Sequence, residues 1–239
     1  MKKNILLILI SISLSCSNQN KNKSNEWINL FDGTSLDGWR AYNGDQMPPG
    51  WKIIDSVLTF KTEQILEQDY NYKGNRDIMY GEEEFENFEL YLEWKIPKGG
   101  NSGIYYHIKE GYGGFADMAQ EYQLLDDENY AEIHDYELKD WQLTAADYAM
   151  HVPDTTQKVL YPPGQWNSSR IIFTPNNVEH WLNDKKVLSF IPWTEQWYEK
   201  RNSGKWDNFP DYGKYKKGYI GLQDHGSNLW FRNIKIKKL

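Results

Sequence analysis

Apolar and polar residues alternate along much of the chain, and this pattern predicts β-strands. In Phe88–Lys95, every second residue is apolar, starting with Phe88, and the residues between are polar or Tyr. A period of two is typical of a strand with one buried face. The same pattern, or a short apolar run between turn residues, predicts strands at 27–31, 51–60 with a turn at 55–56, 104–108, 121–125, 170–174, 178–182, 185–190, 219–222 and 229–237.

One segment favours a helix, at residues 194–201, because it begins with a capping Thr and a Glu soon after. Many short strands separated by turn signals indicate an all-β sandwich or jelly roll. No repeat or linker divides residues 26–239, so we expect a single domain there. Residues 127–165 are long, irregular and rich in Asp, Tyr and Pro. Such a connection is usually functional, and we predict a flap over a cleft.

The N-terminus resembles a bacterial lipoprotein signal. Two lysines precede an apolar run at residues 5–12, which is too short to span a bilayer. Ser13-Leu14-Ser15-Cys16 follows and is similar to a lipobox, with Ser and Leu in the reverse of their commonest order. Cys16 is the only cysteine and therefore cannot form an internal disulfide.

We therefore predict that residues 1–15 are removed as a signal peptide, that Cys16 is lipidated, and that residues 16–25 form a flexible tether. The alternative is an ordinary signal peptide. The lipid would anchor the protein to a membrane of the bacterial cell envelope, on the periplasmic side. Ser17 rather than Asp follows the cysteine, which favours the outer membrane.

Composition narrows the class of ligand. The chain has 11 Trp, 17 Tyr and 9 Phe, and aromatics make up 15% of its residues. Trp and Tyr combine an apolar face with a polar edge, which suits sugars. The alternative is a β-rich core, because aromatics also favour strands. The net charge of −7 argues against nucleic acid as a partner.

Common catalytic motifs do not occur. The sequence has no G-x-S-x-G and no H-E-x-x-H. A glycosidase that works by double displacement needs two carboxylates about 5–5.5 Å apart. Glu121 is followed on its strand face by Gln123 and Leu125, so that strand lacks the second carboxylate. Displacement is disfavoured but stays open, because Glu89 and Glu93 lie on another strand.

Six segments in a fixed order carry a family resemblance. They are Leu30-Phe31-Asp32-Gly33-Thr34-Ser35-Leu36-Asp37-Gly38-Trp39, Phe88-Glu89-Leu90-Tyr91-Leu92-Glu93-Trp94, Asn101-Ser102-Gly103-Ile104-Tyr105-Tyr106, Glu121-Tyr122-Gln123-Leu124-Leu125-Asp126, Val178-Glu179-His180-Trp181-Leu182-Asn183, and Gly221-Leu222-Gln223-Asp224-His225-Gly226 with Trp230-Phe231-Arg232-Asn233-Ile234. Over residues 27–239 the chain resembles the 3-keto-disaccharide hydrolase family. The resemblance implies a concanavalin-like jelly roll of two curved antiparallel sheets and cleavage of 3-keto-glycosides by hydrolysis or lyase chemistry.

This chemistry fits a strand with one carboxylate. A ketone at C3 acidifies the C2 proton, so a base can remove it, and the C1–O bond then breaks by β-elimination before water adds. The route needs one general base, a group that stabilises the oxyanion, and an acid for the leaving oxygen. His225 is the first candidate base, because histidine titrates near neutral pH, and Glu121 is the second. Arg232 is the candidate for the oxyanion.

The motifs also supply candidate substrate-binding residues. These are Gln123, His180, Asn101, Ser102, Glu93, Tyr148 and Trp141, with Tyr130 as a further stacking residue in the flap. A divalent metal ion held by His225, Glu121 or a flap Asp is an option, although no ligand spacing demonstrates it. Three other functions remain open: a non-catalytic carbohydrate-binding lipoprotein, a glycoside hydrolase of the β-glucanase type, and a purely structural lipoprotein.

Overall fold

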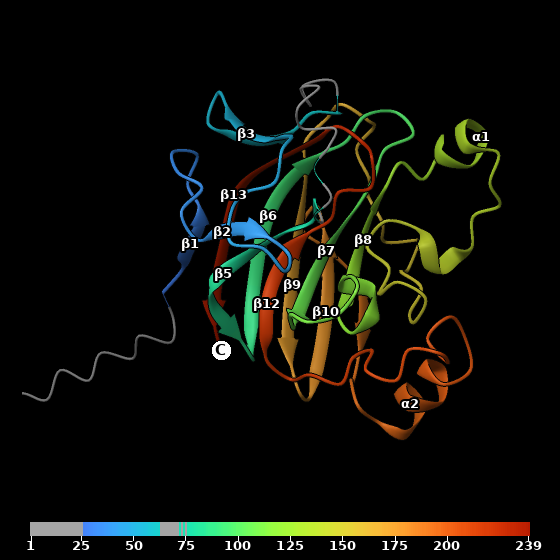
Figure 1. Ribbon diagram of the computed structural model, residues 1–239. Coiled ribbons are helices and arrows are strands. Elements are labelled where there is room, and N and C mark those ends of the chain that lie inside the picture. The colour runs from blue at the N-terminus through green and yellow to red at the C-terminus, as the bar shows by residue number, and fades with distance from the viewer. Residues whose placement is uncertain (1–25, 63–71, 73, 75) are drawn as a thin grey trace, which may run out of the picture.

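The computed structural model describes residues 26–62, 72, 74 and 76–239, and within them the strands form two antiparallel sheets (Figure 1). The larger sheet has the order β11-β10-β9-β6-β13-β4-β3, with β1 also paired to β13, and the smaller has the order β2-β5-β12-β7-β8. The bounds are β1 Ile28–Phe31, β2 Trp39–Ala41, β3 Trp51–Ile54, β4 Val57–Phe60, β5 Ile78–Phe85, β6 Phe88–Lys95, β7 Asn101–Ile108, β8 Gln120–Leu125, β9 Asn167–Thr174, β10 Asn177–Leu182, β11 Lys185–Phe190, β12 Gly218–Leu222 and β13 Leu229–Lys238.

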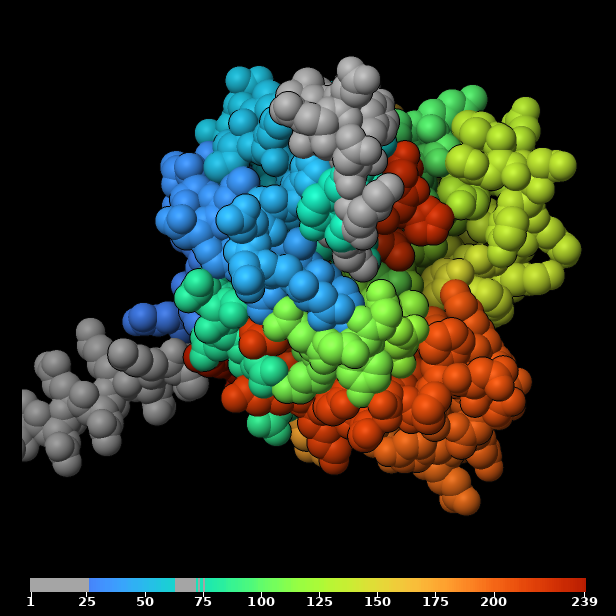
Figure 2. Space-filling model, in the orientation of Figure 1, coloured from blue at the N-terminus to red at the C-terminus, as the bar shows by residue number. Residues whose placement is uncertain are grey.

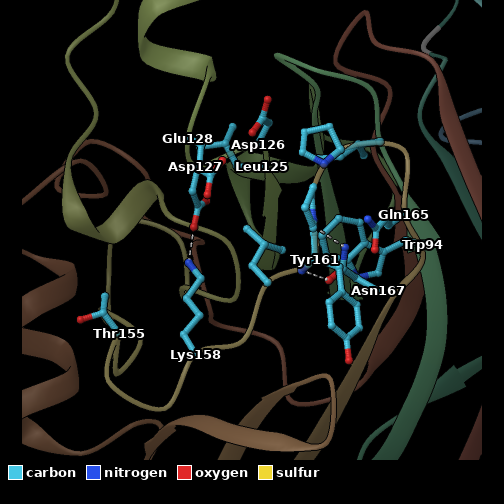
Figure 3. Close-up of a pocket in the computed structure, with 14 residues that line it drawn as sticks. Trp94, Leu125, Asp126, Asp127, Glu128, Thr155, Lys158, Tyr161, Gln165 and Asn167 are labelled. Atoms are coloured by element: carbon cyan, nitrogen blue, oxygen red, sulfur yellow. Dashed lines mark hydrogen bonds and ion pairs between the residues drawn. The ribbon is translucent and has the colours of Figure 1, made fainter.

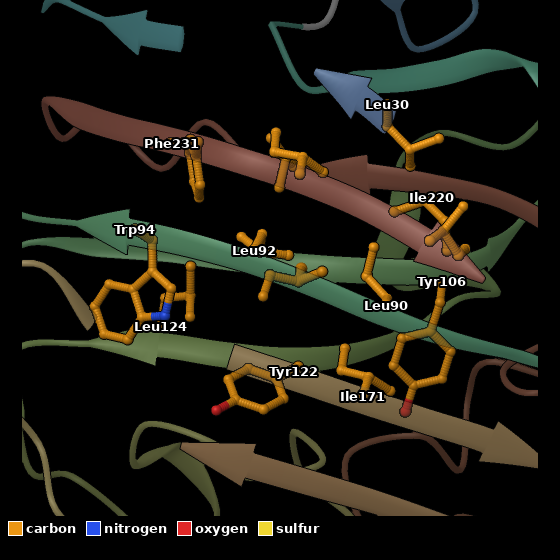
Figure 4. Close-up of a cluster of buried hydrophobic side chains, with 14 of the residues drawn as sticks. Leu30, Leu90, Leu92, Trp94, Tyr106, Tyr122, Leu124, Ile171, Ile220 and Phe231 are labelled. Atoms are coloured by element: carbon orange, nitrogen blue, oxygen red, sulfur yellow. The ribbon is translucent and has the colours of Figure 1, made fainter. Parts of the chain in front are cut away.

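One hydrophobic core lies between the two sheets. Leu90, Leu92 and Trp94 of β6 enter it from the larger sheet, and Tyr122 and Leu124 of β8 enter it from the smaller (Figure 4). Burying a side chain of this size stabilises the fold by about 1.5–3 kcal/mol. The alternation read from the sequence therefore assigns the core-facing side of β6 and β8 correctly, and the predicted concanavalin-like jelly roll is confirmed.

Most predicted elements are present, with ends shifted by a few residues. Asp55 and Ser56 both have positive φ, at 50° and 61°, as the tight turn between β3 and β4 requires. The predicted helix is α2, Glu195–Arg201, and the hydroxyl of Thr194 accepts a hydrogen bond from the amide of Trp197 at 3.2 Å. Strand β5 was not predicted, because its run of three glutamates hides the alternation.

The flap, residues 127–165, is hydrogen-bonded to the free edge of β8. The amide of Tyr148 donates to the Glu121 carbonyl at 3.0 Å, and the amide of Ala145 donates to the Gln123 carbonyl at 2.9 Å. It also contains the short helix α1, Tyr130–His134. The flap and the α2 segment lie on the same side of the molecule, beyond β8 (Figures 1 and 2). The flap thus extends the smaller sheet.

Residues 1–25, with the predicted signal peptide, tether and Cys16, lie outside the described residues. In the described part of the chain, no helix is both long and apolar enough to cross a membrane. Lipidation of Cys16 stays a prediction.

Candidate active site

The candidate site centres on Glu121, on the outer face of the smaller sheet. Its neighbours Tyr122 and Leu124 point into the core, so strand geometry directs Glu121 and Gln123 to the opposite side. That side is not solvated, because Glu121 is only 4% exposed. The flap strand that pairs with β8 brings Tyr148 next to Glu121, and residues 205–212 lie close by. Glu121 is therefore a buried carboxyl outside the hydrophobic core.

A short hydrogen-bond chain holds this carboxyl. Tyr105 of β7 lies directly across from Glu121 in the sheet and donates its hydroxyl to Oε2 at 2.6 Å. Gln223, just after β12, donates its Nε2 to the Tyr105 hydroxyl at 3.3 Å. Burial raises the pKa of Glu121 to about 7, although the Tyr105 hydrogen bond and the Lys205 charge oppose the shift. A carboxyl with this pKa exchanges protons near neutral pH.

Gly103 provides the space that this carboxyl occupies. A Cβ at position 103 would lie 2.3 Å from Oε1 of Glu121 and 2.9 Å from a ring carbon of Tyr105. Both distances are far below ordinary van der Waals contact, so any side chain here would displace the carboxyl or the ring. Gly103 is thus required for the position of Glu121 across β7.

Three amide oxygens on the same face have no hydrogen-bond partner within the described residues. They are Oε1 of Gln123, Oε1 of Gln223 and Oδ1 of Asn101, and each is buried. The other end of the Asn101 amide donates to the hydroxyl of Tyr130 at 3.4 Å. Buried polar atoms are almost always paired in folded proteins, so these oxygens are acceptors suited to the hydroxyl groups of a ligand.

The flap adds aromatic rings beside Glu121, and Lys205, in the segment between α2 and β12, adds a cation. The rings of Trp141 and Tyr148 meet edge to face at 5.2 Å, and Nζ of Lys205 lies 4.1 Å from the centre of the Tyr148 ring. Burial of its ammonium group lowers the pKa of Lys205, while Glu121 acts in the opposite direction. Burial raises the pKa of Tyr148 to about 12, so its hydroxyl stays protonated. The site therefore combines a carboxyl, a cation and rings.

His225 lies in the loop between β12 and β13 and is exposed to solvent. The loop starts within the site, because the amide of Gln223 donates to the Gly103 carbonyl at 3.0 Å. The amide of Asp224 then donates to Oδ1 of Asp77 at 2.8 Å. The negative charge of Asp77 is one of the influences that raise the pKa of Glu121.

Arg232 and Glu93 do not join this group, and the expectation that they would is wrong. Nε of Arg232 donates to Oε2 of Glu93 at 2.6 Å. Both side chains project from the outer face of the larger sheet, since their neighbours Phe231 and Trp94 point into the core. The two sheets therefore separate this ion pair from Glu121.

His180 and Ser102 also have other positions than expected. His180 is fully buried among core residues, where Nδ1 pairs with the carbonyl of Ala145 at 3.0 Å and burial lowers the pKa of the ring to about 4. Ser102 donates its hydroxyl to the carbonyl of Gln223 at 2.8 Å. His180 therefore holds the flap in place, and Ser102 holds the start of the β12–β13 loop. Neither side chain lies with Glu121 on the outer face of the smaller sheet.

The sequence reasoning missed Tyr105, Gln223 and Lys205. Tyr105 and Gln223 lie inside segments that carried the resemblance. Gly103 and Tyr105 are two residues apart on one strand, so the sequence already indicates that they lie on the same face of the sheet. No such signal exists for Lys205, because its segment has no regular pattern.

A divalent metal ion finds no ready ligand set in the described part of the chain. Across residues 26–62, 72, 74 and 76–239, no three His, Cys, Asp or Glu side chains are grouped as a metal site requires.

The chain is similar to several known proteins. Residues 26–237 match the model of a family described as 3-keto-alpha-glucoside-1,2-lyase-like domain. A 3-keto-disaccharide hydrolase from Bacteroides thetaiotaomicron is 35% identical over 234 residues, which cover 89% of this chain and 78% of that protein. A crystal structure of a putative glycosyl hydrolase from Parabacteroides distasonis is 41% identical with a TM-score of 0.78, covering 89% of this chain and 94% of the other. A second structure so described, from the same organism, is 27% identical with a TM-score of 0.64, covering 90% and 100%.

Proposed function

Since the chain belongs to the 3-keto-disaccharide hydrolase family, we propose that it cleaves 3-keto-glycosides by removing the C2 proton, with Glu121 as the base. The observation that supports this most is the buried carboxyl of Glu121, whose pKa of about 7 lets it accept a proton near neutral pH. Tyr105 fixes one oxygen of that carboxyl. Elimination requires one general base of this kind.

The proposed first step moves one proton and one electron pair. Ionised Glu121 takes the proton from C2, and the C2–H electrons form an enolate with the C3 carbonyl. The enolate then expels the C1 oxygen substituent, which leaves a C1–C2 double bond conjugated to the ketone. A proton delivered to the leaving oxygen completes the cleavage.

Other groups have separate roles in this scheme. The ammonium of Lys205 faces Glu121 and stabilises the developing negative charge at the C3 oxygen. His225, which is exposed to solvent, protonates the leaving oxygen. The free oxygens of Gln123, Gln223 and Asn101 accept hydrogen bonds from sugar hydroxyls, and Tyr148 with Trp141 borders the ring.

Water then decides whether the reaction ends as a lyase or a hydrolase. Addition of water to C1, with return of a proton to C2 by Glu121, gives the free 3-keto-sugar. Release of the unsaturated sugar before this addition gives the lyase product.

The test is incubation of the protein with a 3-keto-glucoside and with its unoxidised parent. We expect cleavage of the keto-sugar alone, and deuterium at C2 of the hydrolysed product when the reaction runs in deuterated water. Glu121→Gln should abolish both, while His225→Ala should reduce cleavage and leave binding intact. A non-catalytic sugar-binding protein would bind without cleaving either compound.

Cleavage without deuterium at C2, together with an unchanged rate on a substrate deuterated at C2, would contradict proton abstraction and restore direct displacement. Asp77 would then replace Glu93 as the second carboxylate to mutate. Its charge acts on Glu121 in the same site, whereas Glu93 lies on the other sheet.

A further inference from the structure

A cavity of about 250 Å³ lies where β6, β8 and β9 meet the flap (Figure 3). Trp94 and Leu125 line it from the ends of β6 and β8, and residues 155–165 of the flap close it. None of the Glu121 group contributes to its wall. Leu125 is four residues beyond Glu121 on β8, which places the two about 13 Å apart along the strand. The cavity is therefore distinct from the candidate active site.

One wall carries a charged side chain that is almost completely buried. Lys158 is only 8% exposed and forms an ion pair with Asp127. Burial lowers the pKa of Lys158, and Asp127 opposes that shift. An ammonium group has three N–H donors, and among the described residues Asp127 is the acceptor that Lys158 finds. Donors are thus left for the oxygens of a ligand.

The opposite wall combines aromatic rings with the polar side chains of Gln165 and Asn167, and it is firmly held. Figure 3 shows Trp94 and Tyr161 across the cavity from Lys158. Oδ1 of Asn167 accepts a hydrogen bond from the amide of Tyr161 at 2.9 Å, and its Nδ2 donates to the carbonyl of Tyr161 at 3.2 Å. Tyr161 is itself 45% exposed, so its ring is accessible at the mouth.

Charge and size limit the ligand. Asp126, Asp127 and Glu128 outnumber the single ammonium in the lining, so an anion would be repelled. The volume lies just below the range of about 300–1,000 Å³ that is usual for small-molecule sites. A neutral ring with hydroxyl oxygens on one side and C–H groups on the other fits both walls.

We propose that this cavity binds one neutral hexopyranose unit, with Lys158 donating to its oxygens and Leu160 and Tyr161 bordering its apolar face. This deepens the proposed function, since it rests on a carbohydrate substrate and gives the chain a second place to hold one. The sugar here is bound and not cleaved, because the cavity is separate from Glu121.

The experiment measures binding of methyl α-D-glucopyranoside to the full chain by titration calorimetry and ligand-observed NMR. This sugar has no ketone, so it cannot react. We expect one site with a dissociation constant on the order of 1 mM. Lys158→Met should weaken it at least tenfold, which corresponds to one lost charged hydrogen bond. Tyr161→Ala should weaken it several-fold, and because that residue is exposed, it carries the test if Lys158→Met does not fold.

Two control variants assign the signal. Lys109→Met removes an ammonium paired with Glu84 at 2.5 Å outside the cavity, and Glu121→Gln alters the active site. Both should bind the sugar as the unmodified chain does. The proposal would be overturned if binding were lost in Glu121→Gln but kept in Lys158→Met and Tyr161→Ala. Absence of binding at about 50 mM methyl glucoside, galactoside or mannoside would also overturn it. Failure of the full chain to cleave a 3-keto-glucoside would contradict the proposed function and leave this binding result standing.

Discussion

Replacing Glu121 with Gln should stabilise the protein above neutral pH. In the unfolded chain a Glu ionises with a pKa of 4.5, and in the folded protein burial raises the pKa of Glu121 to about 7. Between these values the folded state binds more protons than the unfolded state, so the free energy of unfolding falls as the pH rises. A difference of about 2.5 pKa units corresponds to about 3 kcal/mol of the free energy of unfolding, and this contribution is lost in full above pH 7. Gln keeps the shape, and its carbonyl oxygen still accepts from Tyr105.

Thermal unfolding followed by circular dichroism at pH 4, 6 and 8 measures this effect. In a chain of this size about 3 kcal/mol raises the midpoint by on the order of 10 °C at pH 8, and the two proteins should unfold alike at pH 4, where the carboxyl is protonated in both states.

Glu93→Gln is a control in which the substitution should change the stability at pH 8 in the opposite direction. Burial alone would raise the pKa of Glu93, but hydrogen bonds from Asn233 and Arg232 outweigh it and lower the pKa, so this substitution should destabilise the protein at pH 8. Equal midpoints for the unmodified chain and Glu121→Gln at pH 8 would show that Glu121 is not desolvated as we describe.

Three further predictions concern activity and anchoring. The rate on a 3-keto-glucoside should rise with pH through about pH 7. Tyr105→Phe should move that rise upward by about 1–2 pH units, because it removes a hydrogen bond to the charged carboxyl of Glu121. A pH profile that does not move would contradict Glu121 as the base. Gly103→Ala should lower kcat by about 100-fold with little change in circular dichroism. Gly114→Ala is the control and should leave kcat unchanged, because an added Cβ there meets nothing within 4 Å. Comparable rates for the two variants would refute the close packing of Gly103 against Glu121 and Tyr105. Cys16→Ser should release the protein from membranes in cell fractionation, and a variant that still pellets after a carbonate wash would refute lipidation.

Alternation along the strands was enough to predict most of the larger sheet and the position of Glu121 on its own strand. It could not predict that the outer face of β8 is buried, because the covering residues come from an irregular segment with no pattern of its own. It also cannot tell which sheet a polar face belongs to. Glu93 and Arg232 share a polar face with each other, but that face is on the far side of the molecule from Glu121.

His180 shows a different limit. It alternates with Glu179 and Trp181 and so shares a face with Val178 and Leu182, both fully buried. The alternation alone is compatible with a buried ring, whereas the motif led to the prediction that His180 binds substrate. Only the contact with the Ala145 carbonyl shows that it supports the flap.

The pairing of the flap with β8 has a consequence for solubility. An edge strand with free N–H and C=O groups is a template on which a second molecule can add a strand and begin to aggregate. Here that edge is occupied, because Tyr148 and Ala145 bond to it and the Thr144 hydroxyl both donates to the Leu125 carbonyl at 2.7 Å and accepts from its amide at 3.0 Å. Deleting the flap to open the site would expose a strand whose residues are all buried, and the expected product is an insoluble protein.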